Sequence, residues 1–133
     1  MYIEVNIIWK EIPGYPNYEA SPEGKIRKAD NQQILKARKQ TDKVYLMVLV
    51  QLPDGRRVKR YVHRLVALAY CEQKVGDTEV HHINGNVLDN RAENLVWISK
   101  REHLMLHNHS LISGEQDGWV RLAHAIVQGG SYD

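Results

Sequence analysis

One stretch of the chain constrains the fold most, because two short apolar runs separated by a polar loop are followed at once by a helix start. Residues 80–83 and 95–98 are these runs, and their composition is typical of strands. An Asn-Gly pair directly after the first run tolerates positive φ and favours a tight turn. Ser99 and Glu102, three residues apart, form a capping box. The sequence therefore predicts a strand–loop–strand–helix unit with its helix over residues 100–109.

Four histidines lie in this unit at positions that suit metal chemistry. His103 and His107 are four residues apart on the predicted helix and share a face. His81 and His82 are adjacent on a strand and point to opposite sides of it. Folding the strands back onto the helix brings His81 beside the helical pair, and three imidazoles can hold a divalent cation while leaving positions open. His82 is then available as a general base, which an imidazole pKa near 6.5 suits.

The remaining polar residues of the unit have simpler interpretations. Asn94 ends the loop between the two strands, and its amide can donate and accept together. We predict that Asn94 ties the loop that carries His82, and an ordinary loop asparagine is the alternative. His63, His109 and His124 are interpreted as surface or core residues without a chemical role.

The charge of the chain is unevenly distributed. Residues 25–64 hold twelve of the eighteen Lys and Arg residues and three acidic residues, a net charge of +9. The rest of the chain carries six basic and thirteen acidic residues, a net charge of −7. This asymmetry predicts a polyanionic partner, with nucleic acid first. A solvated β-surface whose charges serve only solubility is the alternative.

The N-terminal part of the chain is predicted to be β-rich. A first pair of strands is expected at residues 7–9 and 18–20, among several Pro, Gly and Asn turn signals. Residues 44–52 and 57–62 flank a Pro-Asp-Gly turn and predict a hairpin whose return strand is basic.

Helical patterns complete an α+β chain. Residues 63–70 predict a short helix, and apolar residues at helical spacing between Trp119 and Val127 predict an amphipathic tail helix. We therefore expect a β-rich module over residues 1–62, a ββα core over residues 63–109 and a tail over residues 110–133.

The cysteine content and hydropathy indicate a compartment. Cys71 is the single cysteine, which excludes an internal disulfide and favours a reducing environment. No apolar run approaches the roughly 20 residues that span a bilayer, and we see no secretory signal. We expect a cytoplasmic protein, in the host cytoplasm if it is phage-encoded, with no membrane partner.

The histidine unit resembles the HNH nucleases of the ββα-metal class. The three-residue signature of that family falls on His82, Asn94 and His103, and His81 stands at the family's first metal-ligand position. Histidine at both ligand positions is similar to the bacterial-toxin branch, where His107 matches a further ligand.

A second resemblance lies upstream. Residues 9–15, 18–21 and 24–26 resemble the small β module, NUMOD4, that precedes HNH domains in phage and intron homing endonucleases. Residues 62–67 also resemble the approach to the nuclease core in that group. The resemblance implies a β-rich DNA-binding module followed by an HNH nuclease core and a C-terminal amphipathic helix.

These resemblances imply a metal-dependent endonuclease that hydrolyses phosphodiester bonds of double-stranded DNA, by nicking or double-strand cleavage, as a monomer or homodimer. His82 is expected as general base and Asn94 as its loop tie, with one divalent metal on His81, His103 and His107. Mg²⁺ or Mn²⁺ is expected first, with Zn²⁺ or Ni²⁺ as alternatives because imidazole ligands favour them. A non-catalytic DNA-binding protein with a structural metal is one alternative, and a ribonuclease or general nuclease is another.

The basic segment supplies the candidate DNA contacts, most of them to phosphates. The candidates are Arg27, Lys28, Lys36, Arg38, Lys39, Arg56, Arg57, Lys59, Arg60 and Arg64.

Overall fold

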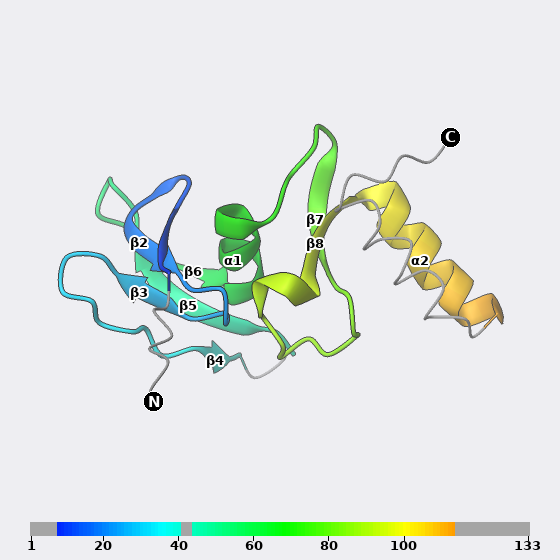
Figure 1. Ribbon diagram of the computed structural model, residues 1–133, viewed down its shortest axis with the longest axis horizontal. Helices are drawn as coiled ribbons and strands as arrows, with labels where there is room; N and C mark the ends of the chain where they lie inside the picture. Colours follow the sequence, from blue (N-terminus) through cyan, green and yellow to red (C-terminus); the bar gives the residue numbers. More distant parts are fainter. Residues whose placement is uncertain (1–7, 41–43, 114–133) are drawn as a thin grey trace, which may run out of the picture.

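The structure is a computed structural model that describes residues 8–40 and 44–113 (Figure 1). It is an α+β fold of eight strands, two α-helices and one short 3₁₀ helix within these residues. In chain order they are β1 (Lys10–Ile12), β2 (Tyr15–Ala20), β3 (Ile26–Lys28), β4 (Arg38–Lys39), β5 (Leu46–Gln51), β6 (Arg57–Tyr61), α1 (Val62–Tyr70), β7 (Asp77–His82), η1 (Ala92–Asn94), β8 (Leu95–Ser99) and α2 (Lys100–Ser113). No helix in this part of the chain is long and apolar enough to cross a membrane.

The strands form three small antiparallel sheets, with orders β1-β2-β3, β4-β5-β6 and β7-β8. Helix α1 lies between the two N-terminal sheets and the β7-β8 hairpin, and α2 extends away from the hairpin (Figure 1). The hairpin thus has α1 against one part of it and α2 against another.

One hydrophobic cluster joins the N-terminal sheets to the hairpin through α1. Ile12 and Val48 come from the first two sheets, Leu65 from α1 and Trp97 from β8, and all are buried. The indole Nε1 of Trp97 also donates to the carbonyl of Ala67 in α1 at 3.1 Å. The position of β8, and with it the histidine-bearing hairpin, is therefore set by packing across α1.

The predicted strand–loop–strand–helix unit is confirmed. Both hydrogen bonds of the capping box form: Ser99 N donates to Glu102 Oε1, and Glu102 N donates to Ser99 Oγ, each at 3.0 Å. Helix α2 runs to Ser113, beyond the predicted end, with Leu106 buried against β8.

Other local predictions differ from the structure. The first strand was expected at residues 7–9 but lies at Lys10–Ile12, where a two-residue turn through Gly14, with φ +84°, lets it pair with β2. The short β4 and η1 were not predicted, because two or three residues carry no readable periodicity. The predicted tail helix between Trp119 and Val127 lies outside the described residues.

Candidate functional site

His81 lies on β7 and His103 on α2, and these two elements pack against each other. His81 is half-buried on β7, and its Nε2 is buried without a hydrogen-bond partner among the described residues. Burial first, and then the nearby charges of His103 and His82, lower the pKa of His81 to about 4. His81 is therefore neutral at pH 7 and keeps a nitrogen lone pair that nothing in the described chain uses.

This donor chemistry fits a divalent metal. A buried, unpartnered imidazole nitrogen is costly unless it binds something, and a metal ion is a common partner for neutral imidazole. His103, exposed on α2, is a second imidazole on the element that packs against β7. No three His, Cys, Asp or Glu side chains converge as a metal-binding group in residues 8–40 and 44–106. The side chain of the third expected ligand, His107, lies outside the described set.

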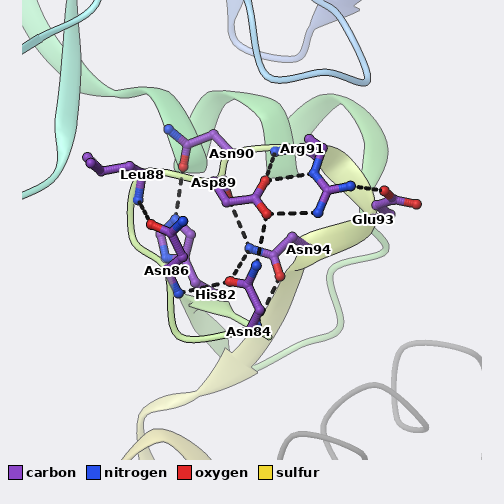
Figure 2. A network of polar contacts seen from close by, with 9 residues as sticks. All are labelled: His82, Asn84, Asn86, Leu88, Asp89, Asn90, Arg91, Glu93 and Asn94. Carbon is purple, nitrogen blue, oxygen red and sulfur yellow. Dashed lines mark hydrogen bonds and ion pairs between the residues drawn. The ribbon is translucent and has the colours of Figure 1, made fainter.

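His82 points to the other side of β7 and is 5% exposed. Its Nε2 lies 2.9 Å from Oδ1 of Asn90 (Figure 2). An amide oxygen can only accept, so this bond requires the proton on Nε2 and leaves Nδ1 as the basic nitrogen. Burial lowers the pKa of His82, and the Asn90 bond and the charge of Asp89 oppose that shift.

Two aromatic rings pack against His82, and a third ring packs against those two. The Tyr45 ring stacks on it, with centroids 6.0 Å apart and planes at 18°. The His63 ring lies 5.0 Å from it, and the Tyr61 ring lies 5.2 Å from His63. His63 is 6% exposed, and burial, with the charges of His82 and Arg64, lowers its pKa to about 3.

His63 was missed as a neighbour of His82. It is the second residue of α1, nineteen positions before His82, and the packing of α1 against the hairpin brings the two rings together. No local pattern in the sequence indicates this contact.

The loop between β7 and β8 is held by amide side chains (Figure 2). Asn94 Nδ2 donates to the carbonyl of Asp89 at 2.9 Å and to Asn84 Oδ1 at 3.0 Å, and its Oδ1 accepts from Asn84 N at 3.0 Å. The Asp89 carboxylate accepts from Arg91 and from Asn84, which holds the pKa of Asp89 well below its usual range. Asn94 thus fixes both ends of the loop that begins at His82.

Basic residues gather on the outer face of the β4-β5-β6 sheet. Alternation along β6 puts Arg57 and Lys59 on the face opposite to buried Val48 and Val50 of β5. A groove of about 710 Å³ lies on this sheet. Its basic lining residues are Lys36, Arg38, Lys39 and Lys59.

The face leads toward His82. Tyr61 pairs with Met47 and lies two residues beyond Lys59 on the same side of β6. Tyr61 in turn contacts Tyr45 and His63, which surround His82. The basic face therefore ends at Tyr61, whose ring is connected to His82 through Tyr45 and His63.

The other candidate DNA contacts are divided by what their side chains already do. Arg27 pairs with Glu19 at 2.9 Å, and Arg56 pairs with Asp54 at 2.7 Å. The remaining engaged arginines donate to oxygens elsewhere: Arg60 to the hydroxyl of Tyr15 at 2.9 Å, and Arg64 to the carbonyl of Thr78 at 3.0 Å. Ion pairs with other described residues are absent for Lys28, Lys36, Arg38, Lys39, Arg57 and Lys59.

Two family descriptions match separate parts of the chain. Residues 8–50 match the NUMOD4 motif, which covers β1 to most of β5. Residues 60–105 match the HNH endonuclease family HNH_3, which contains α1, the hairpin and the first part of α2.

Two known proteins are similar to most of the chain. The chain is 37% identical over 101 residues, 73% of its length, to an uncharacterized HNH endonuclease, L247, of Acanthamoeba polyphaga mimivirus, and covers 25% of that protein. It is 31% identical over 94 residues, 70% of its length, to the DNA endonuclease I-HmuI of Bacillus phage SP01, and covers 53% of that protein. The chain thus spans a quarter to about half of these two relatives.

A solved structure extends the likeness to the whole fold. It is described as DNA binding and cleavage by the HNH homing endonuclease I-HmuI, and it superposes with a TM-score of 0.66 at 25% identity over 92% of this chain and 68% of that one. Residues 60–105 are therefore an HNH endonuclease domain, preceded by a NUMOD4 motif, in a fold that is similar to that of an HNH homing endonuclease.

Proposed function

We propose that this protein is a metal-dependent endonuclease that hydrolyses phosphodiester bonds of double-stranded DNA. One observation carries the proposal: the neighbouring residues His81 and His82 have opposite environments on the two sides of β7. His81 has a buried Nε2 without a partner among the described residues, and burial and the nearby His103 lower its pKa, while His82 is held by Asn90 with Nδ1 as its basic nitrogen. One side suits a metal ligand and the other a general base.

His82 acts as the base in this scheme. Its Nδ1 takes a proton from a water molecule whose oxygen attacks the phosphorus, and the bond from phosphorus to the leaving O3′ breaks. The leaving oxygen takes a proton from solvent, which gives a 5′-phosphate and a 3′-hydroxyl. The bond from Nε2 to Asn90 fixes the ring so that Nδ1 keeps one orientation.

His81 and His103, with His107 as the expected third ligand, would hold one divalent ion. When bound, the ion would offset negative charge on a phosphate oxygen and on the leaving group. Mg²⁺ and Mn²⁺ remain the first candidates for activity, and the imidazole donors also suit Zn²⁺ and Ni²⁺.

The outer face of the β4-β5-β6 sheet would bind the DNA backbone. Arg38, Arg57 and Lys59 are exposed there, and the groove beside them is open to solvent. Phosphate contacts of this kind give affinity and register without reading sequence. The ring of Tyr61 contacts His63, and His63 contacts His82, which supports a DNA path that runs from Lys59 toward the base.

A plasmid assay tests the function. Supercoiled plasmid is incubated with purified protein in EDTA and then with Mg²⁺, Mn²⁺, Zn²⁺ or Ni²⁺, and a gel separates nicked from linear product. We expect cleavage only with a divalent ion, and loss of cleavage in His82→Ala with DNA affinity retained. His124→Ala serves as the histidine control, because the sequence gives that residue no chemical role.

The alternatives predict different gels. A DNA-binding protein with a structural metal binds plasmid but leaves it supercoiled with every ion. A ribonuclease cuts RNA in preference to duplex DNA when both are supplied. Cleavage by His82→Ala at the wild-type rate would remove His82 from the mechanism.

A further inference from the structure

A turn of the N-terminal module contacts the loop that holds the proposed base. Gly24, in the turn between β2 and β3, lies against the backbone of Asn90, the residue that binds His82. A Cβ on Gly24 would come within 2.6 Å of the Asn90 carbonyl oxygen and 2.7 Å of its carbonyl carbon. No side chain fits at this position without moving Asn90.

The turn itself is firmly held. Ser21 is fully buried, its N donates to Lys25 O at 2.9 Å, and its carbonyl accepts from Gly24 N at 3.0 Å. Immediately before the turn, the hydroxyl of Tyr70 in α1 donates to the carbonyl of Ala20 at 2.7 Å. The turn is therefore held on both sides of Gly24, so a Cβ added there presses on the Asn90 backbone.

A second contact joins the same turn to the same loop. Ala92 N donates to the carbonyl of Pro22 at 2.8 Å. Asn90 and Ala92 are thus both in contact with residues 21–24, one by close packing and the other by a hydrogen bond. On the far side, Asn94 holds the carbonyl of Asp89, next to Asn90 in the chain.

We propose that turn 21–24 positions His82 through Asn90, so that the N-terminal module completes the active site in addition to contacting DNA. Gly24 is a positioning residue in this scheme: it sets where the Asn90 backbone lies, and the Asn90 side chain then sets the orientation of the His82 ring. The inference rests on the proposed function, because it assigns the module a role toward the base of that reaction.

A matched pair of glycine variants tests the packing. Gly24 and Gly76 have nearly the same φ, +96° and +92°, but nothing lies within 4 Å of a Cβ placed on Gly76. Gly24→Ala and Gly76→Ala therefore impose the same backbone strain, and only the first displaces Asn90. We expect Gly24→Ala to lower kcat by roughly tenfold or more with KM for DNA little changed, because a misplaced base loses part of its contribution. Gly76→Ala should cleave like the wild type.

The hydrogen bond from Ala92 to Pro22 can be removed without changing the packing of Gly24 on Asn90. Ala92 is the first residue of η1, and Arg91 before it is extended, with φ −61° and ψ 140°. Proline is tolerated in this setting, so Ala92→Pro removes the N–H that Pro22 binds with little backbone strain. We expect it to lower kcat in the same direction as Gly24→Ala. It also keeps the test available if Gly24→Ala does not fold.

The imidazole ring of His82 gives a readout independent of cleavage. Side-chain ¹⁵N chemical shifts of metal-free protein report which ring nitrogen carries the proton. We expect Nε2 to be protonated in the wild type and in Gly76→Ala, and a mixture of tautomers in Gly24→Ala and in Asn90→Ala. The double variant Gly24→Ala/Asn90→Ala should cut no more slowly than Asn90→Ala alone, because both changes act through one bond.

The outcomes separate the two proposals. If Gly24→Ala matches Gly76→Ala in both kcat and ¹⁵N shifts, or if the double variant loses activity additively, the positioning role is wrong. If the wild type does not cut DNA with any ion, the proposed function fails, while the ¹⁵N shifts still decide whether the turn orients His82.

Discussion

Asn84 and Asn94 bind each other reciprocally: Asn84 N donates to Asn94 Oδ1, and Asn94 Nδ2 donates to Asn84 Oδ1, each at 3.0 Å. The pair closes the loop between β7 and β8 at the residue where β8 begins. Asn84 lies two residues after His82. The Asn84–Asn94 bonds therefore help to fix the backbone that carries the proposed base.

Replacing Asn94 should cost both stability and cleavage. Asn94→Ala removes three hydrogen bonds of a side chain that is 5% exposed and leaves the half-buried Asp89 carbonyl without this donor. We expect a loss of roughly 2–4 kcal/mol in the free energy of unfolding, measured by urea denaturation. Asn86→Ala, at an exposed asparagine whose Oδ1 accepts only from nearby Leu88 N, should lose less than about 1 kcal/mol. Equal losses of stability in the two variants would argue against a special role of the Asn94 hydrogen bonds.

The capping box should control the helix that carries His103. Ser99→Ala removes the acceptor for Glu102 N, and an N-cap serine of this kind contributes about 0.5–2 kcal/mol. We expect faster hydrogen exchange of the first-turn amides of α2 and weaker Mn²⁺ binding by calorimetry. Glu102→Gln keeps an oxygen that can accept from Ser99 N, so its exchange should stay near that of the wild type. Unchanged exchange in Ser99→Ala would contradict this account.

The parts of the fold that were predicted from the sequence are those whose signals are local. The capping box at Ser99 and Glu102 and a helix over residues 63–70, observed at Val62–Tyr70, were predicted because three-residue spacings and helical periodicity lie within one element. The first strand was misplaced because its pairing depends on a bulge between Glu11 and Ile12. No local sequence pattern predicts this bulge.

The surroundings of His82 could not be predicted in the same way. Tyr45, His63 and Gly24 are far from His82 in the sequence, and contacts among three separate elements have no periodicity to reveal them. The sequence predicted different roles for His81 and His82 because neighbouring residues on a strand point to opposite sides. The structure agrees that the two side chains have different surroundings: His82 is buried, and His81 has an unpartnered Nε2. Their chemical roles remain predictions until the cleavage and metal assays are done.

DNA affinity should depend more on the basic residues of the outer face of the β4-β5-β6 sheet than on arginines that already form ion pairs. The triple variant Arg38→Gln/Arg57→Gln/Lys59→Gln removes three charges from the outer face of the β4-β5-β6 sheet. We expect the slope of log K against log salt to become shallower by about 2–3, since each phosphate contact contributes about 0.9. Fluorescence anisotropy with a duplex oligonucleotide from 50 to 300 mM salt, roughly the range over which such contacts weaken, measures it. Lys74→Gln, on the exposed loop after α1, is the control, and the same slope in both variants would move the DNA surface elsewhere.

Acid should destabilise the metal-free protein through His63. Burial lowers the pKa of His63 from 6.5 to about 3 in the folded state, so between these values the unfolded chain binds a proton that the folded chain does not. Stability is therefore highest above pH 6.5 and falls as the pH drops toward 3. At about 1.4 kcal/mol per pH unit, lowering the pH from 8 to 5 should cost about 2 kcal/mol through this residue alone. His63→Leu should lose that component in urea denaturation with EDTA present, while His81, whose pKa is lowered to about 4, leaves a remaining slope in both proteins. An identical pH dependence in wild type and His63→Leu would mean that the His63 ring takes up its proton without cost, and that the packing around His82 is looser than the structure shows.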